Sequence, residues 1–211
     1  MKDEFFDRWS SLHGGVAVTG LVKGWLTISY FLCRPLAAAK VTPNFLTLCG
    51  VLASACICIT HHSFWGIVFL VFSLICDGID GTLAIITSKD SARGAMLDSV
   101  ADRIGEFFWL VAFYLLGAPI WIIGVAWVAA FSQEYVRARI AGLGDFRIDI
   151  VTISERPVRA SFLGIAVVVD LLKINLVTQT AWIWLFFQVI SLVMVSRSGF
   201  RRLREADSIG N

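Results

Sequence analysis

Charged residues are scarce in this sequence: Asp, Glu, Lys and Arg together make up 16% of its 211 residues. A soluble globular domain of ordinary composition carries about 25% charged residues. Apolar residues reach 57%, and the mean hydropathy is +0.77. This composition excludes an ordinary soluble domain and indicates an integral membrane protein.

Cysteine pairs of the metal-binding kind are also lacking. The five cysteines contain no Cys-x-x-Cys spacing, which argues against a structural zinc site. We interpret them as small apolar residues that pack in or beside helices. They are Cys33, Cys49, Cys56, Cys58 and Cys76.

Long apolar runs predict an all-α, polytopic membrane protein, because a transmembrane helix needs about 20 mostly apolar residues. Six transmembrane helices are expected near residues 45–62, 64–87, 95–117, 119–141, 157–173 and 180–198. With these spans, every Lys and Arg except Lys173 falls on one side of the membrane. The positive-inside rule then places both termini, the 85–94 turn and the 140–158 loop in the cytoplasm.

An apolar stretch from Val16 to about Leu36 precedes these spans and is interrupted by Lys23 and Arg34. At about 100° per residue, the two cations lie within roughly 20° of each other on a helix. We therefore expect an N-terminal amphipathic helix in the cytoplasmic interface, with both cations toward the headgroups. The alternative is a seventh span with a central lysine, which would break the charge asymmetry. Residues 1–15 are polar and are expected at the surface.

Four aspartates, Asp77, Asp80, Asp98 and Asp102, lie inside the most apolar half of the chain. A carboxylate at membrane depth is costly, so it is by default a candidate functional residue. Residues three or four apart lie on one helix face, so each pair can direct both carboxylates to one point. Two such helices facing each other would form a cage of oxygen ligands for magnesium, calcium or manganese.

Small residues accompany the aspartates. Gly81 and Ala84 follow Asp80 on the same predicted helix, where they either pack against another helix or leave room for a ligand. Gly94 comes one turn before Asp98 and fits a turn or a helix cap.

The segment from Val41 to Thr47 precedes the first predicted span. Pro43 is suited to the first turn of a helix. Asn44 and Thr47 could cap that helix. Alternatively, the free backbone donors at the helix start could bind a phosphate or a base edge.

Arginines gather at the cytoplasmic ends of the last three predicted spans. Each could act only as a topology determinant. Together they could hold a phosphate, because a guanidinium group binds phosphate through paired hydrogen bonds. A metal–carboxylate site beside such a cluster implies phosphoryl-group chemistry. The arginines are Arg137, Arg139, Arg156, Arg159 and Arg197.

The spacing of the acidic segment follows a long motif, D-x-x-D-G-x-x-A-R, eight residues, then G-x-x-x-D-x-x-x-D. In this motif the sequence resembles the CDP-alcohol phosphatidyltransferase family. The Tyr-Val-Arg-Ala-Arg segment at 135–139 and the Glu-Arg-Pro segment at 155–157 resemble the actinobacterial branch that makes phosphatidylinositol phosphate. The matching positions are Asp77, Asp80, Gly81, Ala84, Gly94, Asp98 and Asp102.

The resemblance implies transfer of a phosphatidyl group from CDP-diacylglycerol to the hydroxyl of a phosphorylated alcohol, with release of CMP. Inositol phosphate is the favoured acceptor and glycerol phosphate the next. The implied metal is Mg²⁺ or Mn²⁺, held by Asp77, Asp80, Asp98 and Asp102, and Asp102 is also the implied general base. The acceptor phosphate maps onto the five arginines above. The CDP-lipid maps onto Asn44, Phe45, Leu46, Thr47, Gly81, Ala84 and Ser91.

The resemblance also implies a homodimer in the plasma membrane, surrounded by membrane lipids and without a nucleic-acid partner. Its polar cavity and active site would open to the cytoplasm and the inner leaflet. The chain would form one membrane domain over residues 1–211. Within it, 1–42 is a cytoplasmic or interfacial segment, 43–198 the six-helix core and 199–211 a cytoplasmic tail.

One position departs from the family motif. Ile85 stands where the family has an arginine that contacts the CDP-lipid pyrophosphate. Arg93, just ahead of Gly94, could substitute from the facing helix. The departure leaves open a catalytically idle protein that binds a nucleotide or a lipid. A metal-coupled transporter is a further alternative, although the sequence shows no paired repeats of the kind common in transporters.

Overall fold

A computed structural model describes residues 2–12, 15, 17–143 and 150–209, and this part of the chain is all-α, with eight helices and no strand. The expected fold class is therefore confirmed for the described residues. The helices are α1 (Lys2–Leu12), α2 (Gly20–Ala38), α3 (Pro43–Thr60), α4 (Phe64–Ile86), α5 (Ala92–Leu115), α6 (Ile120–Gly142), α7 (Arg156–Leu171) and α8 (Val177–Ile209).

The six predicted spans coincide with helices α3 to α8, although α8 continues well past the expected end near residue 198. Within the described residues, three helices are long and apolar enough to cross a membrane. These are α3, α4 and α8, with mean hydropathies of 1.7, 1.9 and 1.5. Helix α5 contains both Asp98 and Asp102, and α7 has only 16 residues. Three candidate spans are thus supported, and the count of six stays a prediction.

The chain divides into two compact units. The first unit comprises Met1–Ile57 and Val68–Glu106, and the second comprises Cys58–Ile67 and Phe107–Asn211. Helices α3, α4 and α5 each contribute to both units. The four aspartates belong to the first unit and the five arginines to the second.

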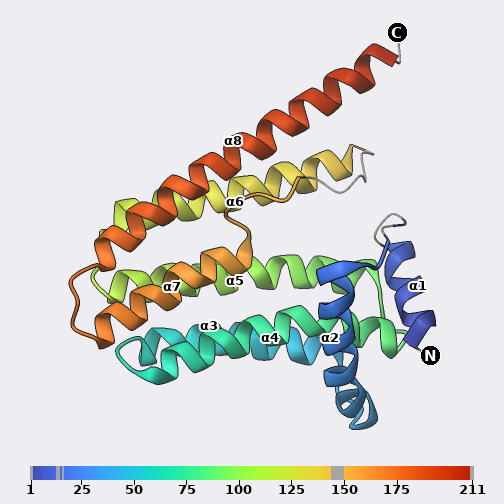
Figure 1. The fold of residues 1–211 in the computed structure, drawn as a ribbon, viewed down its shortest axis with the longest axis horizontal. Coiled ribbons are helices and arrows are strands. Elements are labelled where there is room, and N and C mark those ends of the chain that lie inside the picture. Colours follow the sequence, from blue (N-terminus) through green and yellow to red (C-terminus); the bar gives the residue numbers. More distant parts are fainter. Residues whose placement is uncertain (1, 13–14, 16, 144–149, 210–211) are drawn as a thin grey trace. The chain divides into compact units, whose positions relative to one another are not determined.

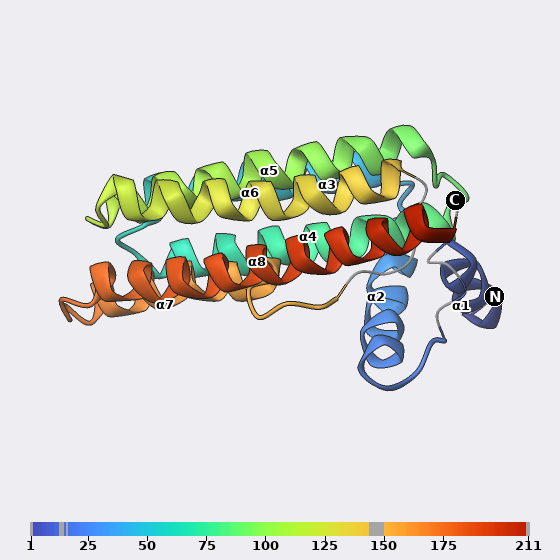
Figure 2. The same ribbon diagram turned by 90° about the horizontal axis from the view of Figure 1, so that it is seen from above.

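In the first unit, α2 runs across the direction of α3 and α4 (Figures 1 and 2). Its buried side chains pack on α4, and the Thr82 hydroxyl donates a hydrogen bond to Ser29 Oγ at 3.1 Å. The buried residues Cys33, Leu46, Ile79 and Leu83 form an apolar cluster that joins α2, α3 and α4. An N-terminal helix was expected here, and its location in the membrane interface stays a prediction.

Helix α1 was not anticipated, because its sequence is mostly polar. Phe5 nevertheless buries its ring against Tyr30 of α2, with the ring centroids 5.4 Å apart. Arg8 also forms an ion pair with Asp90, whose Oδ2 lies 2.8 Å from Arg8 Nη2. These two contacts connect α1 to α2 and to the turn between α4 and α5.

In the second unit, α8 packs against α6 and α7, and Figure 1 shows α6 and α8 running side by side. Two fully buried glutamines meet at this contact, where Gln188 Nε2 donates to Gln133 Oε1 at 2.8 Å. Ser154 extends the network by donating its hydroxyl to Gln188 and its backbone N–H to Ser191. Because buried polar groups are costly when unpaired, this network fixes the segment that leads into α7.

Candidate functional site

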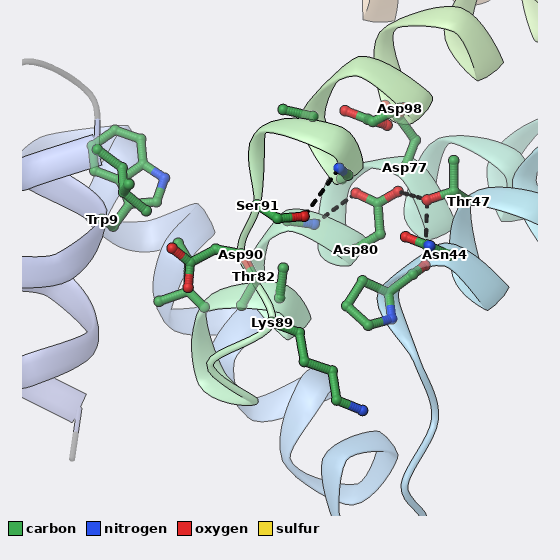
Figure 3. Close-up of a pocket in the computed structure, with 18 of the residues that line it drawn as sticks. Trp9, Asn44, Thr47, Asp77, Asp80, Thr82, Lys89, Asp90, Ser91 and Asp98 are labelled. Carbon is green, nitrogen blue, oxygen red and sulfur yellow. Dashed lines mark hydrogen bonds between the residues drawn. The ribbon is translucent and has the colours of Figure 1, made fainter.

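A cavity of about 1040 Å³ lies in the first unit, lined by all of its helices (Figure 3). Helices α3, α4 and α5 supply polar residues, among them Asn44, Asp77 and Asp98. Helices α1 and α2 supply an apolar wall that includes Trp9 and Trp25. The cavity thus combines carboxylates with an apolar surface, as a site for an amphiphilic substrate requires.

Three of the four aspartates converge. Asp77, Asp98 and Asp102 each offer one carboxylate oxygen, and these three oxygens lie within 4.8 Å of one another. Magnesium and calcium bind oxygen ligands at about 2.0–2.6 Å, so two ligands of one ion are separated by no more than about 4–5 Å. The three residues are half-buried and come from two helices. Their donor type and spacing therefore fit a divalent cation.

Asp80 lies at the same cavity but differs from the other three. It is only 4% exposed, and both of its carboxylate oxygens accept hydrogen bonds. The Thr47 hydroxyl donates to Oδ2 at 2.6 Å, and the Gly81 backbone N–H donates to Oδ1 at 2.6 Å. Figure 3 shows the Asp80 carboxylate directed toward Thr47. The structure thus brings three aspartates together and fixes the fourth beside them.

Two helices that border the cavity begin with hydroxyl caps. The Phe45 N–H donates to Thr42 Oγ1 at 3.3 Å, so Thr42 caps α3, which begins at Pro43 as expected. Thr47 does not cap this helix, because its hydroxyl lies 2.6 Å from Asp80 Oδ2 and 3.3 Å from the Pro43 carbonyl. At α5, the Gly94 N–H donates to Ser91 Oγ at 3.1 Å, and this bond makes Ser91 the capping residue.

The residues expected to contact the CDP-lipid fall into two groups. Leu46 is buried in the cluster around Cys33, and Phe45 and Arg93 are exposed and do not line the cavity. The remaining candidates do line it, and they are Asn44, Thr47, Gly81, Ala84 and Ser91.

Several cavity residues were missed from the sequence. Trp9, Trp25 and Lys89 line the cavity, although none belongs to the motif. A Cβ built on Gly78 would lie 2.6 Å from Trp25 Cζ2, so the indole can occupy this place only because residue 78 lacks a side chain. A glycine follows each of Asp77 and Asp80, and a glycine at such a position is a sequence signal for close packing.

Arg137 and Arg159 are held by carboxylates in the second unit. Arg137 forms two bonds to Glu155, at 2.9 and 2.7 Å, and Arg159 Nη2 lies 3.2 Å from Glu134 Oε1. Arg159 is 3% exposed. Glu134 and Arg137 lie three residues apart on one helix and also form an ion pair, at 3.4 Å, and this spacing is a sequence signal that the arginines have carboxylate partners.

The other three arginines differ in environment. The Arg156 guanidinium lies over the Trp109 ring, 5.4 Å from its centroid. Arg139 and Arg197 are exposed. The five residues therefore do not form one uniform phosphate-binding surface within the second unit.

Glu155 connects the segment before α7 to α6, and its ionisation contributes to stability. Burial alone would raise its pKa, but hydrogen bonds from Arg137 and from the N–H and hydroxyl of Thr152 outweigh burial and lower the pKa to about 2. A lowered pKa stabilises the fold at pH values above the ordinary pKa of glutamate. This contribution is lost as the pH falls toward 2.

We therefore expect Glu155→Gln to reduce the free energy of unfolding at pH 7 by about 2 kcal/mol. The difference from wild type should shrink as the pH is lowered from about 5 to 2. Thermal unfolding in detergent at a series of pH values measures this, with Asp3→Asn, a substitution at an exposed residue of α1, as the control. An equal loss at every pH would contradict an ionised Glu155.

Comparison with known proteins identifies the family. Residues 40–199 match the sequence profile of the CDP-alcohol phosphatidyltransferase family. The chain belongs to this family. The archaetidylinositol phosphate synthase of Pyrococcus horikoshii is 30% identical over 161 residues, which cover 73% of this chain and 84% of the relative. The phosphatidylinositol phosphate synthase of Cutibacterium acnes is 30% identical over 145 residues, covering 63% and 70%.

The fold of this CDP-alcohol phosphatidyltransferase family member is also found in a crystal structure. Phosphatidylinositol phosphate synthase of Mycobacterium tuberculosis with bound CDP-DAG matches it with a TM-score of 0.67 at 22% identity. The match covers 82% of this chain and 94% of the other. A further crystal structure of that protein contains manganese and citrate. The expectation of a CDP-alcohol phosphatidyltransferase, based on the spaced aspartates, is confirmed at the level of the family.

Proposed function

We propose that this protein transfers a phosphatidyl group from CDP-diacylglycerol to the hydroxyl of inositol phosphate and releases CMP. The observation that carries the proposal is the convergence of Asp77, Asp98 and Asp102 beside a cavity with both polar and apolar walls. The inositol phosphate acceptor is supported by relatives, since both relatives compared above are named as synthases of an inositol phosphate lipid.

Asp77, Asp98 and Asp102 would hold Mg²⁺ or Mn²⁺. A bound divalent cation neutralises negative charge on a pyrophosphate and on a departing phosphate. Asp102 would in addition take the proton from the acceptor hydroxyl as it attacks the lipid-linked phosphorus. Asp80, fixed by Thr47 and Gly81, would serve as a further oxygen ligand at a constant position.

The nucleotide would lie along the residues of the motif that line the cavity. Gly81 and Ala84 present little side chain there, so a ligand can approach the backbone of α4 closely. Asn44, at the start of α3, offers an amide with both donors and an acceptor for a base edge. Ser91 lies at the start of α5, where free backbone donors favour a phosphate.

The acceptor phosphate would be bound by arginines of the second unit. Arg139 and Arg197 are exposed candidates, and Arg156, which lies over the Trp109 ring, is a third. Arg137 and Arg159 would bind a phosphate by exchanging these carboxylate partners for phosphate oxygens. A free alcohol has no anionic group for this cluster, so we propose that it is a poor acceptor.

The protein would act as a homodimer in the plasma membrane. One membrane domain would cover residues 1–211, with six spans over 43–198 and with both termini and the cavity on the cytoplasmic side. The three helices of sufficient length and hydropathy support a multi-pass arrangement. The distribution of Lys and Arg supports this orientation.

A panel of radiolabelled acceptors tests the function. Purified protein is supplied with CDP-diacylglycerol, Mn²⁺ and one acceptor, and both CMP and the labelled lipid are measured. We expect inositol phosphate to be converted. Free inositol and serine, which have no phosphate, should react at least about tenfold more slowly, the loss expected when one charged hydrogen bond is missing. Glycerol phosphate keeps the phosphate and should also react more slowly than inositol phosphate, because it lacks the inositol ring. If glycerol phosphate were the only acceptor converted, the assignment of inositol phosphate as the acceptor would be wrong. Absence of CMP release with every acceptor would favour an idle binding protein.

A further inference from the structure

The motif position that should carry an arginine is apolar in this protein, and the structure shows where its side chain goes. Ile85 lines the cavity and packs against the cluster formed by Phe5, Leu26 and Tyr30. Residue 85 therefore contributes an apolar contact to the N-terminal helices and no charge to the cavity.

The end of α4 returns the chain to this same place. Ser88 adopts a left-handed conformation with φ of 52°, and its N–H donates to the Ile85 carbonyl at 3.1 Å. The Lys89 N–H donates to the Ala84 carbonyl at 2.8 Å. These two bonds form a Schellman motif, which commonly brings the residue after the left-handed position against the last turn of its helix. Lys89 is thereby fixed beside Ala84 and Ile85.

Lys89 is also the charge best placed to serve the cavity. Among the described residues that line it, Lys89 is the only Lys or Arg. The adjacent Asp90 pairs with Arg8 at 2.8 Å, so its negative charge is already compensated. Figure 3 shows the Lys89 side chain at the edge of the cavity, with its amine turned away from Asp80 and Asp98. A lysine has a flexible four-carbon stem, so the amine can turn toward a bound anion.

We propose that Lys89 supplies the positive charge for the CDP-lipid pyrophosphate that family members take from the arginine at position 85. This inference rests on the proposed function, because it names a binding residue for the same substrate. Arg93, the substitute expected from the sequence, is exposed and lies outside the cavity lining among the described residues. In this protein the charge would thus come from the turn that follows α4, and not from the position on α4 that Ile85 occupies.

Lys89→Gln and Lys89→Arg test the role of this charge. In Lys89→Gln we expect the KM for CDP-diacylglycerol to rise roughly tenfold with kcat little changed, since a contact to the ground-state pyrophosphate is lost. Equilibrium binding of CDP-diacylglycerol in Mn²⁺ without an acceptor should weaken by the same factor. Lys89→Arg keeps the positive charge, so its KM and its affinity for CDP-diacylglycerol should lie within about twofold of the wild-type values. Lys40→Gln, at an exposed residue of the same unit outside the cavity, should leave both unchanged.

The binding assay separates this inference from the proposed function. If wild type binds CDP-diacylglycerol but releases no CMP with any acceptor, the transfer reaction is contradicted, and a weaker affinity in Lys89→Gln still supports Lys89. If wild type releases CMP and Lys89→Gln binds as tightly as wild type, Lys89 is contradicted and the function stands. An equal weakening in Lys40→Gln would overturn the inference, because the effect would then be one of surface charge.

Discussion

Replacing Asp98 by asparagine is expected to reduce CMP release about 1000-fold, because the substitution keeps the side-chain size and removes one of three converging carboxylates. A metal ion can contribute several kcal/mol to a reaction of this kind, and about 4 kcal/mol corresponds to a factor of about 1000. CMP release from CDP-diacylglycerol with inositol phosphate and excess Mn²⁺ measures the effect. Asp98 is the member that both joins the triad and lines the cavity from α5.

The matched control is Asp7→Asn, on the exposed side of α1 and outside the cavity lining. It removes the same charge and should retain full activity. The melting temperature of Asp98→Asn should equal or exceed that of wild type without metal, since one of three repelling carboxylates is removed. Activity above about one tenth of wild type in Asp98→Asn would rule out the triad as the centre of the reaction.

Gly81→Leu should weaken substrate binding strongly without damaging the fold. A Cβ built on Gly81 meets no atom within 4 Å, and the residue lines the cavity, so a leucine would project into the space meant for the ligand. Within a helix the exchange improves intrinsic propensity by up to about 1 kcal/mol. We expect CDP-diacylglycerol to bind about 100-fold more weakly, which corresponds to about 3 kcal/mol of steric conflict. Equilibrium binding and thermal unfolding are measured on the same preparation.

Gly24→Leu provides the comparison for this substitution. Gly24 lies on α2, a Cβ there also meets no atom within 4 Å, and the residue does not line the cavity. This variant should bind CDP-diacylglycerol as wild type does. Undiminished binding by Gly81→Leu would show that the ligand occupies a different part of the protein.

The helices of the core were predictable because apolar runs of about 20 residues leave few other interpretations. Pro43 marked the start of α3, and short polar breaks separated the following helices. Helix α1 was not predictable, since it has 11 residues and is held mainly through Phe5 and the Arg8–Asp90 pair. Contacts to distant residues of this kind leave no periodic pattern in the sequence.

The aspartates were predictable from their spacing, since helix geometry alone places Asp98 and Asp102 on one face. The Thr47–Asp80 bond joins residues 33 positions apart and depends on how α3 packs against α4. Lys89 likewise reaches the cavity only because the chain reverses at Ser88. The residue types of the metal site are therefore visible in the sequence, whereas the contacts that hold or supplement them depend on the packing of distant segments.

The most direct test of the metal site is Mn²⁺ binding followed by electron paramagnetic resonance. Titration of wild type should show saturable binding, and Asp77→Asn, Asp98→Asn and Asp102→Asn should each weaken it at least about tenfold, the loss typical for one charged ligand. Asp7→Asn should bind as wild type does. Mn²⁺ affinity unchanged by all three triad substitutions would contradict the assignment of Asp77, Asp98 and Asp102 as the metal ligands.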